Sequence, residues 1–152
     1  MSDTQYVVAR LGDQHYGIRV SEVNQIIRAV EPTPIPGMHG NIEGIINLRG
    51  HIIPVVDIRP LFGIVRHEST RDSRIVVVNI QHHDIGLYVD AVSEVLAISG
   101  DIVEIPDSLV LDFDATYLNG IAKMDDRLVL LLNLAAALDI ADIANGMEPV
   151  AA

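Results

Sequence analysis

Short apolar runs rich in valine and isoleucine alternate with turn-forming residues along most of the chain. Strand-forming runs on both sides of a tight turn are the signature of a β-hairpin. Four pairs of runs fit this description: residues 6–11 with 16–20, 44–48 with 52–56, 74–80 with 85–89, and 117–124 with 127–133. The pattern predicts four hairpins, and in the second of them two buried strands are joined by a turn at Arg49 and Gly50.

The period changes between residues 20 and 30. Apolar residues recur there at steps of three and four, and Ser21 stands where it can cap a first helical turn. We expect an amphipathic helix that ends near Ala29, because the prolines at positions 32, 34 and 36 prevent its continuation. Its apolar stripe either packs entirely in the core or partly lines a groove for a partner helix.

Other segments are less regular. Residues 58–63 predict one helical turn, residues 93–98 a strand, and residues 134–144 a terminal helix. Residues 65–72, with little apolar content, predict a mobile loop, and residues 100–116 an acidic, loop-rich connection. Many short strands without regular strand–helix alternation favour small antiparallel barrels over a parallel sheet.

Three blocks of sequence occur twice, in the same order. Residues 6–11 correspond to residues 75–80, and the motif that starts at Gly17 corresponds to one at Gly86, both at an offset of 69 residues. Gly44-Ile45 returns as Gly120-Ile121 at an offset of 76. Such spacing indicates an internal duplication, and hence two similar β subdomains in one body.

Composition narrows the class of protein. The 152 residues suffice for a self-contained core, and 49% of them are hydrophobic, yet no apolar run approaches the roughly 20 residues of a membrane-spanning helix. No basic-then-apolar leader is present, so we expect a cytoplasmic protein without direct membrane insertion. The absence of cysteine fits that compartment and excludes disulfides and thiolate metal sites.

The charge balance argues against one kind of partner. The formal net charge is -11, and the basic residues are scattered, whereas nucleic acid binding depends on clustered Lys and Arg. We therefore expect no nucleic acid partner.

Residue patterns for catalysis are also missing. The chain has no nucleophile elbow, no phosphate-binding loop and no His-Glu-x-x-His motif, although acid and base residues distant in sequence can still meet in space. We expect no cofactor. The densest ligand-like cluster, His82-His83-Asp84, is best explained as a surface turn. A small metal- or ligand-binding β-barrel that uses these histidines is a further reading.

Arg49 is the first candidate for function. The turn at Arg49-Gly50 places an arginine in solvent between two apolar strands, and no neighbour in the sequence is suited to neutralise it. A polar residue at a hairpin tip is also the ordinary structural solution.

The strand–turn–strand segment resembles a known signature. Gly44-Ile45-Ile46-Asn47-Leu48-Arg49-Gly50 followed by Ile53-Pro54-Val55-Val56-Asp57 is similar to that of the CheW family of bacterial chemotaxis coupling proteins, and the similarity extends over residues 6–138. The resemblance implies one CheW-like domain over residues 1–152, built from two five-stranded SH3-like barrels around a shared interior. The repeat halves are expected at residues 5–63 and 74–139, with possible strand exchange, and a flexible tail at 145–152.

The resemblance also implies partners and a site. It suggests a non-enzymatic scaffold that couples the cytoplasmic tip of methyl-accepting chemotaxis receptors to the regulatory domain of the histidine kinase CheA, recruited to receptor arrays at the membrane. An adaptor of another chemosensory pathway, such as one for pilus-driven motility, is the alternative. Carried over by motif, the receptor-binding residues are Val23, Ile26, Arg49, Ile75 and Gly86. The kinase-binding residues are Gly44 and Gly50.

Overall fold

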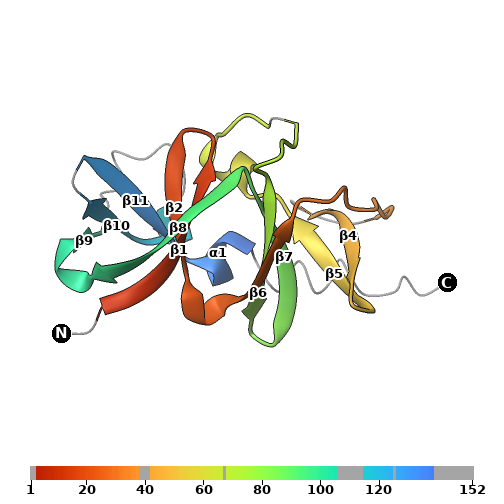
Figure 1. Ribbon diagram of the computed structural model, residues 1–152, viewed down its shortest axis with the longest axis horizontal. Helices are drawn as coiled ribbons and strands as arrows, with labels where there is room; N and C mark the ends of the chain where they lie inside the picture. The colour runs from red at the N-terminus through yellow and green to blue at the C-terminus, as the bar shows by residue number, and fades with distance from the viewer. Residues whose placement is uncertain (1–2, 38–41, 67, 106–114, 125, 139–152) are drawn as a thin grey trace.

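Eleven strands form two sheets that lie side by side in the computed structural model, which describes residues 3–37, 42–66, 68–105, 115–124 and 126–138 (Figure 1). The first sheet has the order β8-β1-β2-β11-β10-β9 and forms what we call subdomain A. The second has the order β3-β6-β7-β5-β4 and forms subdomain B. The chain is therefore mostly β with two β subdomains, as the sequence predicts.

The elements have the following bounds. Subdomain A contains β1 (Asp3–Leu11), β2 (Gln14–Arg19), β8 (Ala91–Ser99), β9 (Val103–Glu104), β10 (Leu118–Met124) and β11 (Arg127–Leu132). Subdomain B contains β3 (Val23–Arg28), β4 (Ile42–Leu48), β5 (His51–Val56), β6 (Arg74–Ile80) and β7 (His83–Val89). The described helices are η1 (Val20–Glu22), η2 (Arg59–Phe62), η3 (Gly100–Ile102), η5 (Ala115–Tyr117) and α1 (Leu134–Leu138). All four predicted hairpins are present.

The two subdomains repeat one strand arrangement with their strands exchanged. β1, β2, β8, β10 and β11 of subdomain A occupy the places that β6, β7, β3, β4 and β5 occupy in subdomain B. Each sheet thus takes a hairpin from one half of the sequence and three or more strands from the other. Each also contains one parallel pair, β2 with β11 and β5 with β7, so the expected purely antiparallel barrels are corrected on this point.

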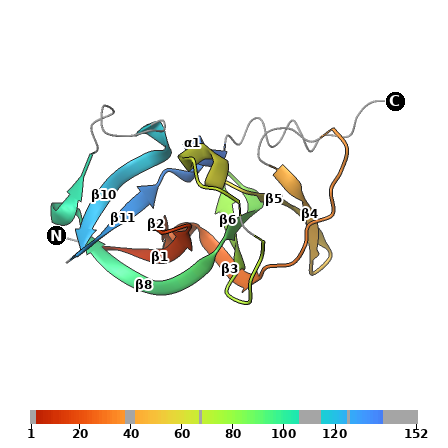
Figure 2. The same ribbon diagram turned by 90° about the horizontal axis from the view of Figure 1, so that it is seen from above.

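Both sheets are closed by the same device. The chain that leaves edge strand β8 forms β9 and pairs with Ile121 of β10, and the chain that leaves β3 reaches Ile45 of β4 through Thr33 (Figure 2). At the crossing in subdomain B, a Cβ on Gly44 would lie 2.5 Å from the carbonyl oxygen of Thr33. Gly120 is equally crowded by Val103 and Glu104. Glycine is required at both crossings because only it permits such close approach of two backbones.

Apolar side chains form three clusters. One fills the interior of subdomain A, one fills the interior of subdomain B, and the largest lies between them and includes α1. Ile75 and Val77 of β6 face the interior of subdomain B, while Val76 and Val78 face the shared cluster. Because β6 is buried on both faces, it reads in the sequence as a continuous apolar run rather than an alternating one.

The helix predicted for residues 20–29 is wrong. Only the single turn η1 is helical, and β3 follows it with partly buried and exposed residues in strict alternation. A spacing of four residues fits both a helix and a strand. Val23 and Ile27 would share one helix face, and they also share one strand face because four is a multiple of the strand period of two. Pairing with β6 decides between the two periods, as β-branched side chains fit an edge strand well.

Smaller expectations have mixed outcomes. Residues 93–98 form a strand within β8, and η2 provides the turn that ends at Gly63 in a left-handed conformation. Ile52 was expected in a buried strand but is 56% exposed, because it lies next to the hairpin tip. α1 begins at Leu134 as predicted; its expected extension to residue 144, the tail at 145–152 and most of the acidic segment 100–116 lie outside the described residues.

Candidate partner-binding surface

The Arg49 turn is a two-residue hairpin connection with a left-handed backbone. Arg49 and Gly50 have φ angles of 53° and 83°, the arrangement of a type I′ turn, and the N–H of Gly50 donates to Oδ1 of Asn47 at 3.0 Å. The Arg49 side chain is exposed and has no ion-pair or hydrogen-bond partner within the part of the chain that the structure describes. A guanidinium that is always charged is thus presented on a rigid tip.

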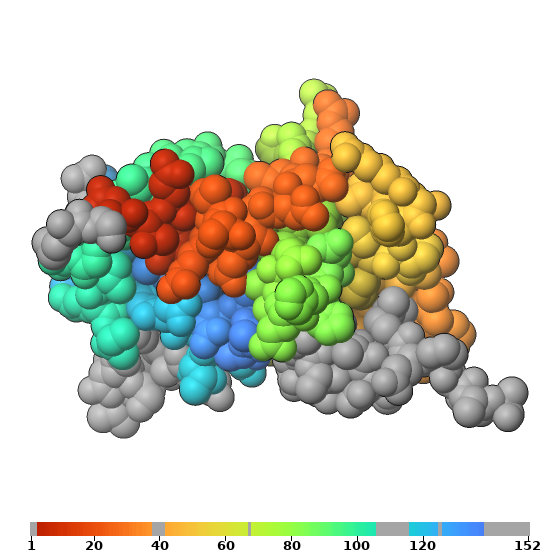
Figure 3. Space-filling view, turned by 90° about the horizontal axis from the view of Figure 1, so that it is seen from below, coloured from red at the N-terminus to blue at the C-terminus, as the bar shows by residue number. Residues whose placement is uncertain are grey.

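A hollow of about 290 Å³ lies beside this tip. It is lined by Asn24, Gln25, Leu48, Arg49, His51, Ile53, Val77 and Asp84. Figure 3 looks onto this end of the molecule, where the orange segment with η1 and β3 lies next to the green β6–β7 and yellow β4–β5 hairpins. We call the residues that line this hollow the tip surface. They come from three segments that are distant in sequence, and they include polar side chains and the guanidinium of Arg49.

The equivalent positions in subdomain A carry an ion pair. Arg127 of β11 pairs there with Glu94 of β8. By the offsets of the duplication, these two residues correspond to His51 and Gln25, which line the hollow in subdomain B without an ion pair between them. The two repeats therefore differ at these equivalent positions: an ion pair in subdomain A and a hollow in subdomain B.

Two of the residues assigned to receptor binding lie on β3, which also supplies Asn24 and Gln25 to the tip surface. Ile26 is 39% exposed on the outer face of β3, and Val23 is partly buried against the shared cluster. Of these two residues, Ile26 is the one with an exposed apolar side chain.

Ile75 and Gly86 are placed differently. Ile75 is completely buried, and a Cβ on Gly86 would lie 2.8 Å from Cγ2 of Ile75, so the two residues contact each other inside subdomain B. Neither residue is exposed for direct contact with a receptor, and their assignment to receptor binding stays a prediction.

The two residues assigned to the kinase also separate. Gly44 is buried under Thr33, where it permits closure of the barrel. Gly50 is exposed and shares its turn with Arg49. A kinase contact at Gly50 and a receptor contact at Arg49 would therefore compete for one tip.

A buried ionic network, to which the sequence assigned no role, lies at the opposite end of subdomain B. Arg59 is 3% exposed, and its Nη2 and Nε donate to the carboxylate of Asp57 at 2.9 Å and 3.0 Å. Its Nη1 donates to Oδ1 of Asp90 at 3.2 Å, and its guanidinium lies 4.5 Å above the ring of Tyr88. Burial alone would lower the pKa of Arg59, but hydrogen bonding and the charges of Asp57 and Asp90 outweigh it and raise that pKa.

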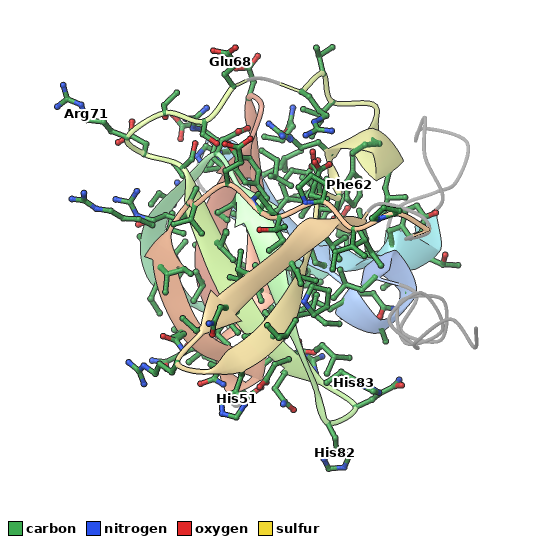
Figure 4. All side chains as sticks on the ribbon, turned by 90° about the vertical axis from the view of Figure 1, so that its right-hand side faces the viewer. His51, Phe62, Glu68, Arg71, His82 and His83 are labelled. Carbon is green, nitrogen blue, oxygen red and sulfur yellow. The ribbon has the colours of Figure 1, made fainter. Side chains whose placement is uncertain are left out.

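The network forms the floor of a cleft of about 520 Å³. Arg66, from the segment after η2, crosses the cleft and pairs with Glu43 at 2.6 Å and with Asp57 at 3.3 Å. Figure 4 shows Glu68 and Arg71 at this end and His51, His82 and His83 at the other. The cleft and the tip surface are therefore separate sites. The signal for the network was present in the sequence as charged residues directly after buried strands, at Asp57 and Asp90.

Metal-binding geometry is not found in the described part of the chain. No group of three or more His, Cys, Asp or Glu side chains is arranged there to hold an ion. His82 and His83 are exposed on the β6–β7 turn, as predicted for a surface turn. None of the described helices is long and apolar enough to cross a bilayer.

Two duplicated β subdomains packed on a shared core define a double β-barrel protein, and subdomain B presents a polar tip at Arg49. Comparison with known proteins gives the family: the CheW-like domain model matches residues 5–142, and the chain belongs to the CheW family of chemotaxis scaffold proteins. Chemotaxis protein CheW of Rhizobium meliloti is 32% identical over 131 residues, which cover 86% of this chain and 84% of that protein.

A solved structure supports the same assignment. The crystal structure of the scaffolding protein TtCheW from Thermoanaerobacter tengcongensis superposes with a TM-score of 0.80 at 40% identity, covering 88% of this chain and 86% of that one. Protein PilI of Pseudomonas aeruginosa matches less completely: it is 28% identical over 85 residues, which cover 55% of this chain and 47% of PilI.

Proposed function

We propose that this scaffold couples the cytoplasmic tip of methyl-accepting chemotaxis receptors to the regulatory domain of the histidine kinase CheA, in arrays at the membrane. The observation that carries the proposal is Arg49, exposed on the two-residue turn of a CheW-family chain and without a partner among the residues that the structure describes. A receptor tip is a helical hairpin, so its apolar face would meet Ile26 and its carboxylates or carbonyls would pair with Arg49. The pilus-linked alternative is supported by the partial match to PilI.

The assignment of Arg49 is tested by Arg49→Ala, with Arg71→Ala as the matched control. Arg71 is also exposed and lies at the opposite end of subdomain B (Figure 4). Hydrogen bonds to a charged group contribute about 1.5–3 kcal/mol, so Arg49→Ala should weaken receptor binding by about tenfold or more. Both variants should fold, because surface changes usually stay within about 0.5 kcal/mol.

The measurement is receptor control of CheA phosphorylation in a reconstituted mixture of receptor vesicles, kinase and scaffold. We expect Arg49→Ala to lose control while Arg71→Ala keeps it. Normal control by a folded Arg49→Ala variant would refute the assignment of Arg49. Failure of the wild-type chain to restore control with any receptor and kinase pair tested would instead count against the proposed function.

A further inference from the structure

The buried ionic network joins the two subdomains at a single residue. Asp90 is the only residue between β7 of subdomain B and β8 of subdomain A. Its N–H donates to the carbonyl oxygen of Arg10 at 2.9 Å, and its Oδ2 accepts from the N–H of Gly12 at 2.7 Å. Since Oδ1 accepts from Arg59 of η2, Asp90 is bound at once to the β1–β2 hairpin and to subdomain B.

The internal duplication shows that the fold does not need these charges. Asp57 and Arg59 correspond to Asn133 and Ala135 in the other repeat, and Asp90 corresponds to Ser21. The strand arrangement is the same where Asn133, Ala135 and Ser21 stand, and these three residues carry no charge to form an ion pair. Ser21 is exposed at the crossing from β2 to β3. The network is therefore an addition at one of two equivalent crossings.

The shared apolar cluster restricts the angle between the two subdomains less sharply than the ionic network does. Apolar burial resists separation of the subdomains, but it is non-directional and tolerates small rotations of one body on the other. Hydrogen bonds to Asp90 hold only within a narrow range of distance and angle. A buried network that spans both bodies thus restricts the angle between them more sharply than apolar packing does.

We propose that Asp57, Arg59 and Asp90 are positioning residues that fix the angle between the two subdomains. The consequence for partners rests on the proposed function: a fixed angle sets the geometry in which receptor and kinase are held together. If loosening reduces the competent orientation to about a tenth of the population, apparent affinity falls about tenfold.

The angle itself is measured without any partner. Because the chain has no cysteine, Ala97→Cys on β8 and Arg28→Cys on β3 give two unique exposed sites, one in each subdomain and both outside the tip surface, for spin labels. The test variant carries Asp57→Asn, Arg59→Ala and Asp90→Ser, which copies the other repeat and leaves no buried charge unpaired. Ser21→Ala, at the equivalent crossing, is the control.

We expect the triple variant to broaden and shift the distribution of distances between the labels, and Ser21→Ala to leave it unchanged. If the triple variant does not fold, Arg59→Lys, which keeps the charge but loses the two-pronged donor geometry, replaces it with the same expectation. An unchanged distribution in a folded variant would overturn the proposal. Loss of folding in both variants would also overturn it, since the network would then serve stability alone. If the distances between the labels broaden but receptors still control CheA phosphorylation as with the wild-type chain, a fixed angle between the subdomains is not needed for coupling.

Discussion

At the scale of single residues, the sequence predicts exposure better than burial. Arg49 follows from a turn between two apolar runs, and the structure places it there without a partner among the described residues. Ile75 and Gly86 could not be placed, because an apolar residue in a strand looks the same whether its face is covered or free. The network of Arg59 was also missed, since its partner Asp90 lies 31 positions along the chain and only the fold brings them together.

Glu22 gives a prediction about pH. Burial raises the pKa of its carboxyl above 4.5, and the nearby charge of Arg19 offsets this only in part. A raised folded-state pKa means that the protonated form is favoured by folding, so its stabilising contribution is complete below about pH 4.5 and is lost as pH rises through the raised value. Glu22→Gln should therefore melt at a higher temperature than the wild type at pH 7, and the difference should shrink as pH falls toward 4.5.

Thermal unfolding followed by circular dichroism from pH 4.5 to 8 measures this difference. Glu31→Gln changes an exposed glutamate nine residues further on in the same half; it serves as the control and should stay within about 0.5 kcal/mol of the wild type. A melting-temperature difference for Glu22→Gln that is constant over the whole pH range would contradict the assignment.

At the scale of elements, the four hairpins were predictable because each is encoded locally, by two apolar runs and a turn. β3 was not, since its period is ambiguous and its identity comes from pairing with β6, about 50 residues away. The closure of each barrel could not be predicted either, because the sequence around Thr33 and β9 is typical of loops. The repeated glycines at positions 44 and 120 were the one sign of the crossings in the sequence.

The crossings predict which glycines are irreplaceable. Gly44→Ala should destabilise the chain, because its Cβ would meet the backbone of Thr33 and its φ of 155° is rarely adopted by other residues. Backbone strain of this kind costs about 1–3 kcal/mol, and displacement of Thr33 adds to it. Gly120→Ala should behave alike, as the equivalent position in subdomain A.

Gly100→Ala is the matched control, since no atom lies within 4 Å of its added Cβ. Urea denaturation gives the comparison: we expect lower midpoints for the variants at 44 and 120 and a change within about 0.5 kcal/mol at 100. Equal midpoints for all three variants would mean that the closing strands are free to move away.

At the scale of the whole molecule, the duplication gave the two subdomains but not their exchange of strands. Offsets of 69 and 76 residues show that blocks are repeated, and they do not show which blocks share a sheet. Exchange has a physical consequence. Because each subdomain is completed by strands from both halves of the sequence, and both pack on one shared cluster, neither half of the sequence carries a complete sheet.

The molecule should therefore unfold as one unit, and Leu87 tests this. Leu87 is fully buried in the shared cluster, so Leu87→Ala should cost about 2–5 kcal/mol through the lost contacts and the cavity that remains. Leu128→Ala removes the same atoms from a side chain that is 49% exposed and should cost far less.

Hydrogen exchange in increasing urea follows β6 of subdomain B and β11 of subdomain A separately. We expect both strands to lose protection at one urea concentration in the wild type and together at a lower one in Leu87→Ala. If β6 were weakened while β11 kept its protection, the shared cluster would not couple the two subdomains, and each would have to be stable through its own interior.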